Sequence, residues 1–231
     1  MMFNKKEVFS LLIAALVIGY LYSLNEISWM GWLSMAGLAL IILFVHHLGQ
    51  KLASLFYDCT SELNLWTVRQ FGLQQWQHFR FDFPFWFIVP AILAVITFPF
   101  MLVKWLAITT FEATPLPSRI RRRYAEITEW HLALIATGGL FMNALLALIS
   151  QIAGWNDFAM LNLYFILFNL VPISKLDGNK IFFGSPMLWI FAVVFTLTMI
   201  IFLGTISTIA TIVAAVFIAV AAVILYYTTY E

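Results

Sequence analysis

The sequence predicts an all-α integral membrane protein with six transmembrane helices. Hydrophobic residues make up 63% of the 231 residues and charged residues only 10%, whereas soluble domains contain about 25% charged residues. Six apolar stretches approach the roughly 20 residues that cross a bilayer. They are residues 8–24, 29–57, 131–153, 158–172, 186–203 and 205–227. We therefore expect one polytopic membrane domain over residues 1–231.

Charge is sparse and orients the chain in the membrane. A net charge of +1 gives no polyanion-binding surface, which excludes a nucleic-acid partner. We expect the protein to lie in the cell membrane. Lys5 and Lys6 precede the first span and place the N-terminus in the cytoplasm, and six spans return the C-terminus to the cytoplasm. Cys59 is the only cysteine, so it forms neither an intrachain disulfide nor a thiolate metal site, and we expect it to be inert.

A seventh apolar stretch, residues 85–111, is irregular. Pro90 and Pro99 interrupt it and Lys104 adds a charge. A single crossing would put the four arginines of residues 119–123 outside, against the positive-inside bias. The stretch is therefore either re-entrant or crosses twice, and the arginines set topology and contact anionic lipid.

Residues 62–83, between the second and third spans, mix apolar and polar side chains. Residues 80–83, Arg-Phe-Asp-Phe, alternate with the period of a half-buried strand. The segment is predicted to be either a small sheet at the membrane surface or an interfacial amphipathic segment with aromatic anchors.

Ionisable and amide side chains are concentrated in two apolar runs. His46, His47 and Gln50 lie in the second span. Asp177 lies in residues 169–178, at the end of the fourth span. Such groups are rare in spans and mark functional sites. His46 and Gln50, four residues apart, share a helix face, whereas His47 is turned by about 100°. We expect only His46 to face Gln50, and Asp177 to meet both.

These runs resemble the motifs of the site-2 protease family, which are intramembrane zinc metalloproteases. That family has a membrane helix with His-Glu-x-x-His, a later helix with Gly-Pro-x-x-Asn, and an Asn-x-x-Pro…Leu-Asp-Gly segment. Residues 44–50, 138–143 and 169–178 carry the counterparts in that order. Gly139-Leu140 stands where the family has Gly-Pro, and the retained glycine is expected to permit close helix approach. The resemblance covers residues 29–184, and the outer spans are additions typical of the family.

The resemblance implies a degenerate metal and catalytic site. His47 stands at the position of the catalytic glutamate, and Gln50 stands at the second zinc histidine. The implied ligand set is His46, Gln50 and Asp177, and because an amide is a poor zinc ligand we expect zinc binding to be weak or absent. Loss of the general base costs a further factor of about 10²–10⁴ in rate.

The resemblance also implies a substrate groove, lined by Asn143, Asn169 and Pro172. The plainer alternatives are that the two asparagines form interhelical hydrogen bonds and cap Asp177. His47 is either a replacement base or a side chain that packs elsewhere. Gln50 is expected to fill the place of the lost ligand as a hydrogen-bonding partner.

The functional hypothesis is a pseudoprotease that binds transmembrane segments of other proteins within the lipid bilayer. The alternative is an active intramembrane zinc protease with an altered metal site, or an inactivated variant of one. A transporter or channel is not favoured, because the sequence has neither inverted repeats nor several pore-lining charges.

Overall fold

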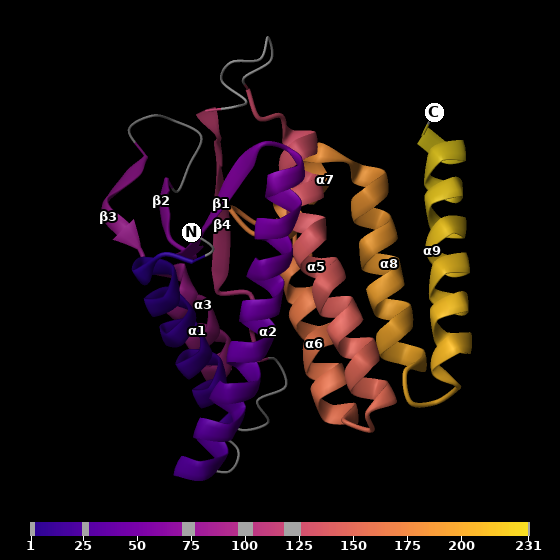
Figure 1. Cartoon of the computed structure of the whole chain (residues 1–231), viewed down its shortest axis with the longest axis horizontal. Helices are drawn as coiled ribbons and strands as arrows, with labels where there is room; N and C mark the ends of the chain where they lie inside the picture. Colours follow the sequence, from indigo (N-terminus) through magenta and orange to yellow (C-terminus); the bar gives the residue numbers. More distant parts are fainter. Residues whose placement is uncertain (1–2, 25–27, 71–76, 97–103, 118–125, 231) are drawn as a thin grey trace. The chain divides into compact units, whose positions relative to one another are not determined.

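The structure is a computed structural model that describes residues 3–24, 28–70, 77–96, 104–117 and 126–230. Helices dominate the described residues (Figure 1). The elements are α1 (Lys5–Ser23), α2 (Trp29–Phe56), β1 (Cys59–Leu65), β2 (Val68–Gln70), β3 (His78–Phe83), α3 (Phe85–Ile96), β4 (Thr109–Pro115), α5 (Glu129–Ile152), α6 (Asn156–Asn169), α7 (Asp177–Gly184), α8 (Pro186–Phe202) and α9 (Thr208–Tyr230).

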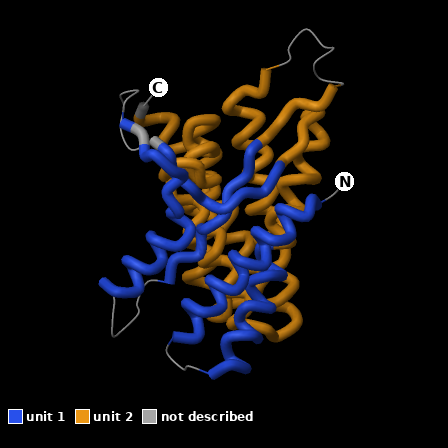
Figure 2. The backbone as a smooth tube through the Cα atoms, turned by 90° about the vertical axis from the view of Figure 1, so that its left-hand side faces the viewer, with its two compact units in different colours: residues 1–43, 62–112 blue, residues 44–61, 113–231 orange. Residues whose placement is uncertain are grey.

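The chain divides into two compact units (Figure 2). Unit 1 comprises residues 1–43 and 62–112, and unit 2 comprises residues 44–61 and 113–231. The boundaries fall inside α2, β1 and β4, so each of these elements contributes residues to both units.

Four helices are long and apolar enough to cross a membrane, which supports the predicted membrane class. They are α1, α2, α5 and α9. Two of the six predicted spans are shorter: α6 has 14 residues and α8 has 17. At 1.5 Å per residue α6 is only about 21 Å long, less than the roughly 30 Å of a hydrocarbon core. Six spans therefore stay a prediction.

The small sheet predicted within residues 62–83 is confirmed, as two two-stranded sheets. β2 pairs antiparallel with β3, with Val68 opposite Phe83. β1 pairs with β4, which begins inside the predicted apolar stretch 85–111 and continues beyond it. The prediction overlooked Ile108-Thr109-Thr110-Phe111, β-branched and aromatic residues that suit a strand.

The irregular stretch 85–111 begins with a short helix. Pro90 lies inside α3 and does not end it, although its ring nitrogen supplies no hydrogen to the Trp86 carbonyl. Pro99 lies outside the described residues. Twelve residues of helix span about 18 Å, too short to cross the hydrocarbon core, so α3 alone is not a crossing.

Unit 1 is held together by close helix packing and a buried carboxylate. A Cβ on Gly19 of α1 would lie 2.6 Å from the Ala36 backbone nitrogen of α2, so only glycine permits this approach. Glu7 of α1 accepts hydrogen bonds from the backbone N–H of Asn4, at 2.6 Å, and of Leu63 in β1, at 3.0 Å. The carboxylate thereby caps α1 and fixes the strand beside it.

In unit 2, glycine also brings α2 against α5. A Cβ on Gly49 would lie 2.5 Å from the Gly138 carbonyl oxygen, and one on Gly138 would lie 2.6 Å from the Ala53 Cβ. α5 packs against α6 and α7, and α8 packs against α9 (Figure 1). This arrangement places the middle of α2 beside α5 and determines what surrounds His46.

Candidate functional site

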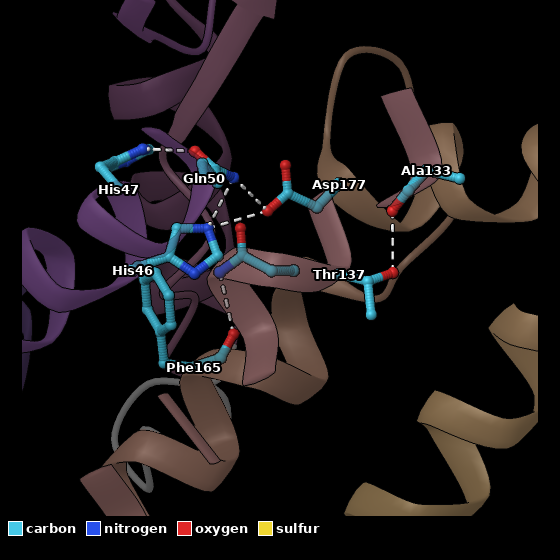
Figure 3. A network of polar contacts seen from close by, with 8 residues as sticks. His46, His47, Gln50, Ala133, Thr137, Phe165 and Asp177 are labelled. Carbon is cyan, nitrogen blue, oxygen red and sulfur yellow. Dashed lines mark hydrogen bonds and ion pairs between the residues drawn. The ribbon is translucent and has the colours of Figure 1, made fainter. Parts of the chain in front are cut away.

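His46 and Asp177 meet as the sequence predicted. The two residues are 131 positions apart, yet His46 Nε2 lies 2.8 Å from Asp177 Oδ2. Their side chains are 1% and 2% exposed, so water does not screen the interaction. Figure 3 shows the imidazole and the carboxylate pointing at each other from α2 and α7.

Gln50 joins the same contact from the next turn of α2. Its Nε2 lies 2.9 Å from Asp177 Oδ2 and 3.0 Å from His46 Nε2. Because a carboxylate oxygen accepts hydrogen bonds, the groups facing Oδ2 are N–H donors, the His46 Nε2–H and the Gln50 amide. The 3.0 Å approach between the two nitrogens is then a contact between two donors that share one acceptor.

His47 also bonds to Gln50, so the prediction that only His46 would face it was wrong. His47 Nδ1 lies 2.7 Å from Gln50 Oε1, and the His47 side chain is buried (Figure 3). On a helix surface, residues three apart are neighbours, as are residues four apart. His47 is turned by about 100° from His46 around the helix axis, but this turn does not move it away from Gln50. We call His46, His47, Gln50 and Asp177 the polar cluster.

Glycine and an aromatic ring enclose the His46 side chain. A Cβ on Gly139 of α5 would lie 2.8 Å from His46 Cε1 and 2.9 Å from the His46 carbonyl oxygen. The expectation that this glycine permits close helix approach is confirmed. The Phe165 ring of α6 packs edge-on against the imidazole, with centroids 5.1 Å apart. Phe165 was not among the predicted site residues, although it lies one turn before Asn169.

Asp177 is positioned by the tight start of α7. It is the first residue of that helix, where the backbone dipole favours a negative charge. A Cβ on Gly178 would overlap the Leu170 carbonyl at the end of α6, so the Leu-Asp-Gly sequence needs its glycine here. Trp189 Nε1 donates to the same Leu170 carbonyl at 2.7 Å, which also fixes this corner.

The asparagines do not cap Asp177, so that alternative was wrong. The Asn143 amide is fully buried and has no hydrogen-bond partner among the residues that the structure describes. Asn169 Nδ2 donates to the Phe165 carbonyl within α6, at 2.9 Å, and Pro172 is exposed between α6 and α7. Their role in a substrate groove stays a prediction.

The polar cluster does not fit a zinc ion. Two ligands about 2.0–2.1 Å from tetrahedral zinc lie about 3.3 Å apart, whereas His46 Nε2 and Asp177 Oδ2 are 2.8 Å apart and bond directly. Gln50 presents an N–H group to them, and an N–H group cannot ligate a metal. Zinc-bound histidines also bond through their second nitrogen, whereas His46 Nδ1 has no partner within the described part of the chain.

Among the described residues, no three His, Cys, Asp or Glu side chains are grouped as a metal site requires. The geometry supports a hydrogen-bonded cluster. The roles that the resemblance assigns to His46, His47, Gln50 and Asp177 stay predictions.

An apolar groove of about 380 Å³ lies between α2 and α5 in unit 2. Gly49, which precedes Gln50, lines it together with Leu52, Phe56 and Phe141, and the last two side chains are largely exposed. The groove exists because Gly49 and Gly138 bring the two helices together and leave larger side chains on either side. It offers apolar surface on the helix that carries most of the polar cluster.

Comparison of the chain with protein-family models, with curated proteins and with solved structures gives no match. The resemblance to site-2 proteases therefore rests on the three motifs and on the meeting of two of them at His46 and Asp177.

Proposed function

We propose that this chain is a site-2-protease-like integral membrane protein that does not cleave peptides and binds transmembrane segments of other membrane proteins. One observation carries the proposal. His46 and Asp177, which the resemblance aligns with two protease ligands, bond directly to each other at 2.8 Å. The proposal includes a cell-membrane location with both termini in the cytoplasm.

Loss of peptide cleavage follows from the chemistry of the polar cluster. Hydrolysis in this family uses a metal-activated water and a carboxylate that takes its proton. Here His47 replaces the carboxylate, and its Nδ1 is bonded to Gln50 Oε1. Gln50 brings an amide N–H where the family has an imidazole ligand.

Binding is supported by the groove between α2 and α5. Its volume of about 380 Å³ suits a few apolar side chains of a neighbouring helix, not a whole helix. Gly49 and Gly138 lie at its base, and small residues of this kind let transmembrane helices approach closely. We infer that a partner helix lies along α2 and α5 and inserts side chains there.

A cleavage assay tests the first half of the proposal. Purified chain in liposomes, mixed with a panel of single-span substrate proteins, should give no cleavage with or without added zinc. Zinc-dependent cleavage that stops on His46→Ala would overturn the proposal and favour an active protease with an altered metal site.

A binding assay tests the second half. A photo-reactive residue at Leu52 or Phe141 should cross-link to reconstituted single-span peptides, and the same residue at Ile209, which is 77% exposed on α9, should do so far less. Equal cross-linking from all three positions would mean that the peptides contact any apolar surface. The binding proposal would then fail.

A further inference from the structure

We propose that His47 and Gln50 act as one unit that replaces a metal ion, in which Gln50 joins His46 to Asp177 and His47 fixes the orientation of the Gln50 amide. The inference rests on one part of the proposed function, the absence of a metal from the polar cluster, and adds what stabilises the cluster instead. It does not depend on the binding of partner helices.

The amide of Gln50 bonds to the carboxylate of Asp177. Its Nε2 lies 2.9 Å from Asp177 Oδ2, and this contact links α2 to the start of α7. A metal ion between an imidazole and a carboxylate would make the same link between the two segments. Here the His46 Nε2–H and the Gln50 amide N–H both donate to one buried carboxylate oxygen, so two N–H donors satisfy Asp177.

The Gln50 amide has to point in one direction to make this bond. A glutamine side chain has one accepting and one donating end, and turning it over exchanges them. In the reverse orientation Oε1 would face the Asp177 carboxylate, and two acceptors would meet in a buried site. The carboxylate therefore disfavours that orientation, and a donor that faces Oε1 on the other side stabilises the observed one.

His47 is that donor. Its Nδ1 lies 2.7 Å from Gln50 Oε1, and since Oε1 can only accept, this nitrogen carries the hydrogen. Both groups are buried, and because water does not replace the bond the orientation is strongly preferred. His47 is thus a positioning residue that acts on Asp177 through Gln50.

The two departures from the protease motif are therefore coupled. A glutamate at position 47 would present an acceptor to Gln50, turn the amide over and place Oε1 against Asp177. A donor at position 47 is needed while glutamine occupies position 50. The coupling explains why both positions differ from the protease pattern together.

The hydrogen position on His47 is tested directly by ¹⁵N spectroscopy of the imidazole in histidine-labelled protein in lipid nanodiscs. His47→Gln identifies the His47 signals by their loss. We expect a protonated Nδ1 and a bare Nε2 at neutral pH. A bare Nδ1 with a protonated Nε2 would overturn the inference, because the amide of Gln50 would then face the other way.

Thermal unfolding of three His47 variants tests the coupling. His47→Gln keeps a donor, His47→Leu removes it and His47→Glu replaces it with an acceptor. We expect the Tm to fall in that order, with His47→Glu lower than His47→Leu by roughly 3–8 °C. As the control, His47→Leu and His47→Glu are each combined with Gln50→Leu. The difference in Tm between these two double variants should be less than half of that between the single variants.

An equal gap with and without Gln50 would overturn the coupling, since the introduced glutamate would then destabilise the protein by its burial alone. Chelator should leave the Tm of the unaltered chain unchanged. A chelator-dependent Tm would mean that a metal stabilises the site and would also overturn the inference. Failure of peptide binding, by contrast, would sink the proposed function and leave these results unchanged.

Discussion

At the scale of single residues, the main feature is a buried carboxylate that faces two N–H donors. Asp177 Oδ2 accepts from the imidazole of His46 and from the amide of Gln50, and all three side chains are at most 2% exposed. The sequence predicted that these residues would meet, because an ionisable group in a membrane span requires a partner. It did not predict the bond from His47, which depends on the rotamers of two neighbouring side chains.

The carboxylate can be tested by substitution. Asp177→Leu leaves two buried donors unpaired, so we expect a loss of about 1–3 kcal/mol in the free energy of unfolding for each donor. Asp177→Asn keeps an accepting oxygen, and its loss should be smaller by at least half. Thermal or denaturant unfolding in detergent measures both variants. Equal losses would indicate that the shape of the side chain matters and its acceptor does not.

At the scale of secondary-structure elements, glycines decide which helices approach each other. Gly139 brings α5 against His46, and Gly178 brings the start of α7 against the end of α6. The sequence indicated the first of these through its resemblance to the protease motif. It did not indicate the second, since nothing near Gly178 in the sequence identifies Leu170 as its neighbour.

Gly139→Ala tests the approach of α5 to α2. The added Cβ would lie 2.8 Å from His46 Cε1, so we expect a loss of about 1–3 kcal/mol and displacement of the imidazole. Gly37→Ala on α2 is the matched control, because a Cβ there meets nothing within 4 Å. The control should gain up to about 1 kcal/mol from its higher helix propensity. A loss of the same size in both variants would contradict the packing account.

Gly178→Ala tests the turn that presents Asp177. The methyl group would overlap the Leu170 carbonyl, and the backbone has to move to accommodate it. We expect a loss of about 1–3 kcal/mol in the free energy of unfolding. Trp189→Phe removes only the 2.7 Å hydrogen bond to the same carbonyl, and should cost about 1 kcal/mol. A smaller loss for Gly178→Ala than for Trp189→Phe would contradict the close contact.

At the scale of the whole molecule, composition predicts a membrane protein, and four sufficiently long apolar helices support that class. The number of crossings does not follow from helix length, because α6 and α8 are short. Charge distribution predicts the topology independently, with residues 85–111 crossing an even number of times.

Cysteine labelling tests this topology. Cys59 is buried, and Cys59→Ser gives a background without thiols. Cysteines at the exposed positions Asp157 and Thr205 should react with a membrane-impermeant maleimide from outside the cell. A cysteine at the exposed Glu112 should react only after permeabilisation. If residues 85–111 crossed once, the labelling pattern of all three positions would be reversed.

The sequence by itself determined the membrane class, the positions of the long helices and the residues of the polar cluster. Apolar runs and isolated ionisable groups are local features, and the bilayer constrains them in the same way wherever they occur. Only the tertiary structure decided that β4 pairs with β1, that Gly178 lies on Leu170 and that Gln50 turns its oxygen to His47 and its nitrogen to Asp177. These contacts join distant segments or depend on the orientation of a side chain, and hydropathy and spacing along the chain specify neither.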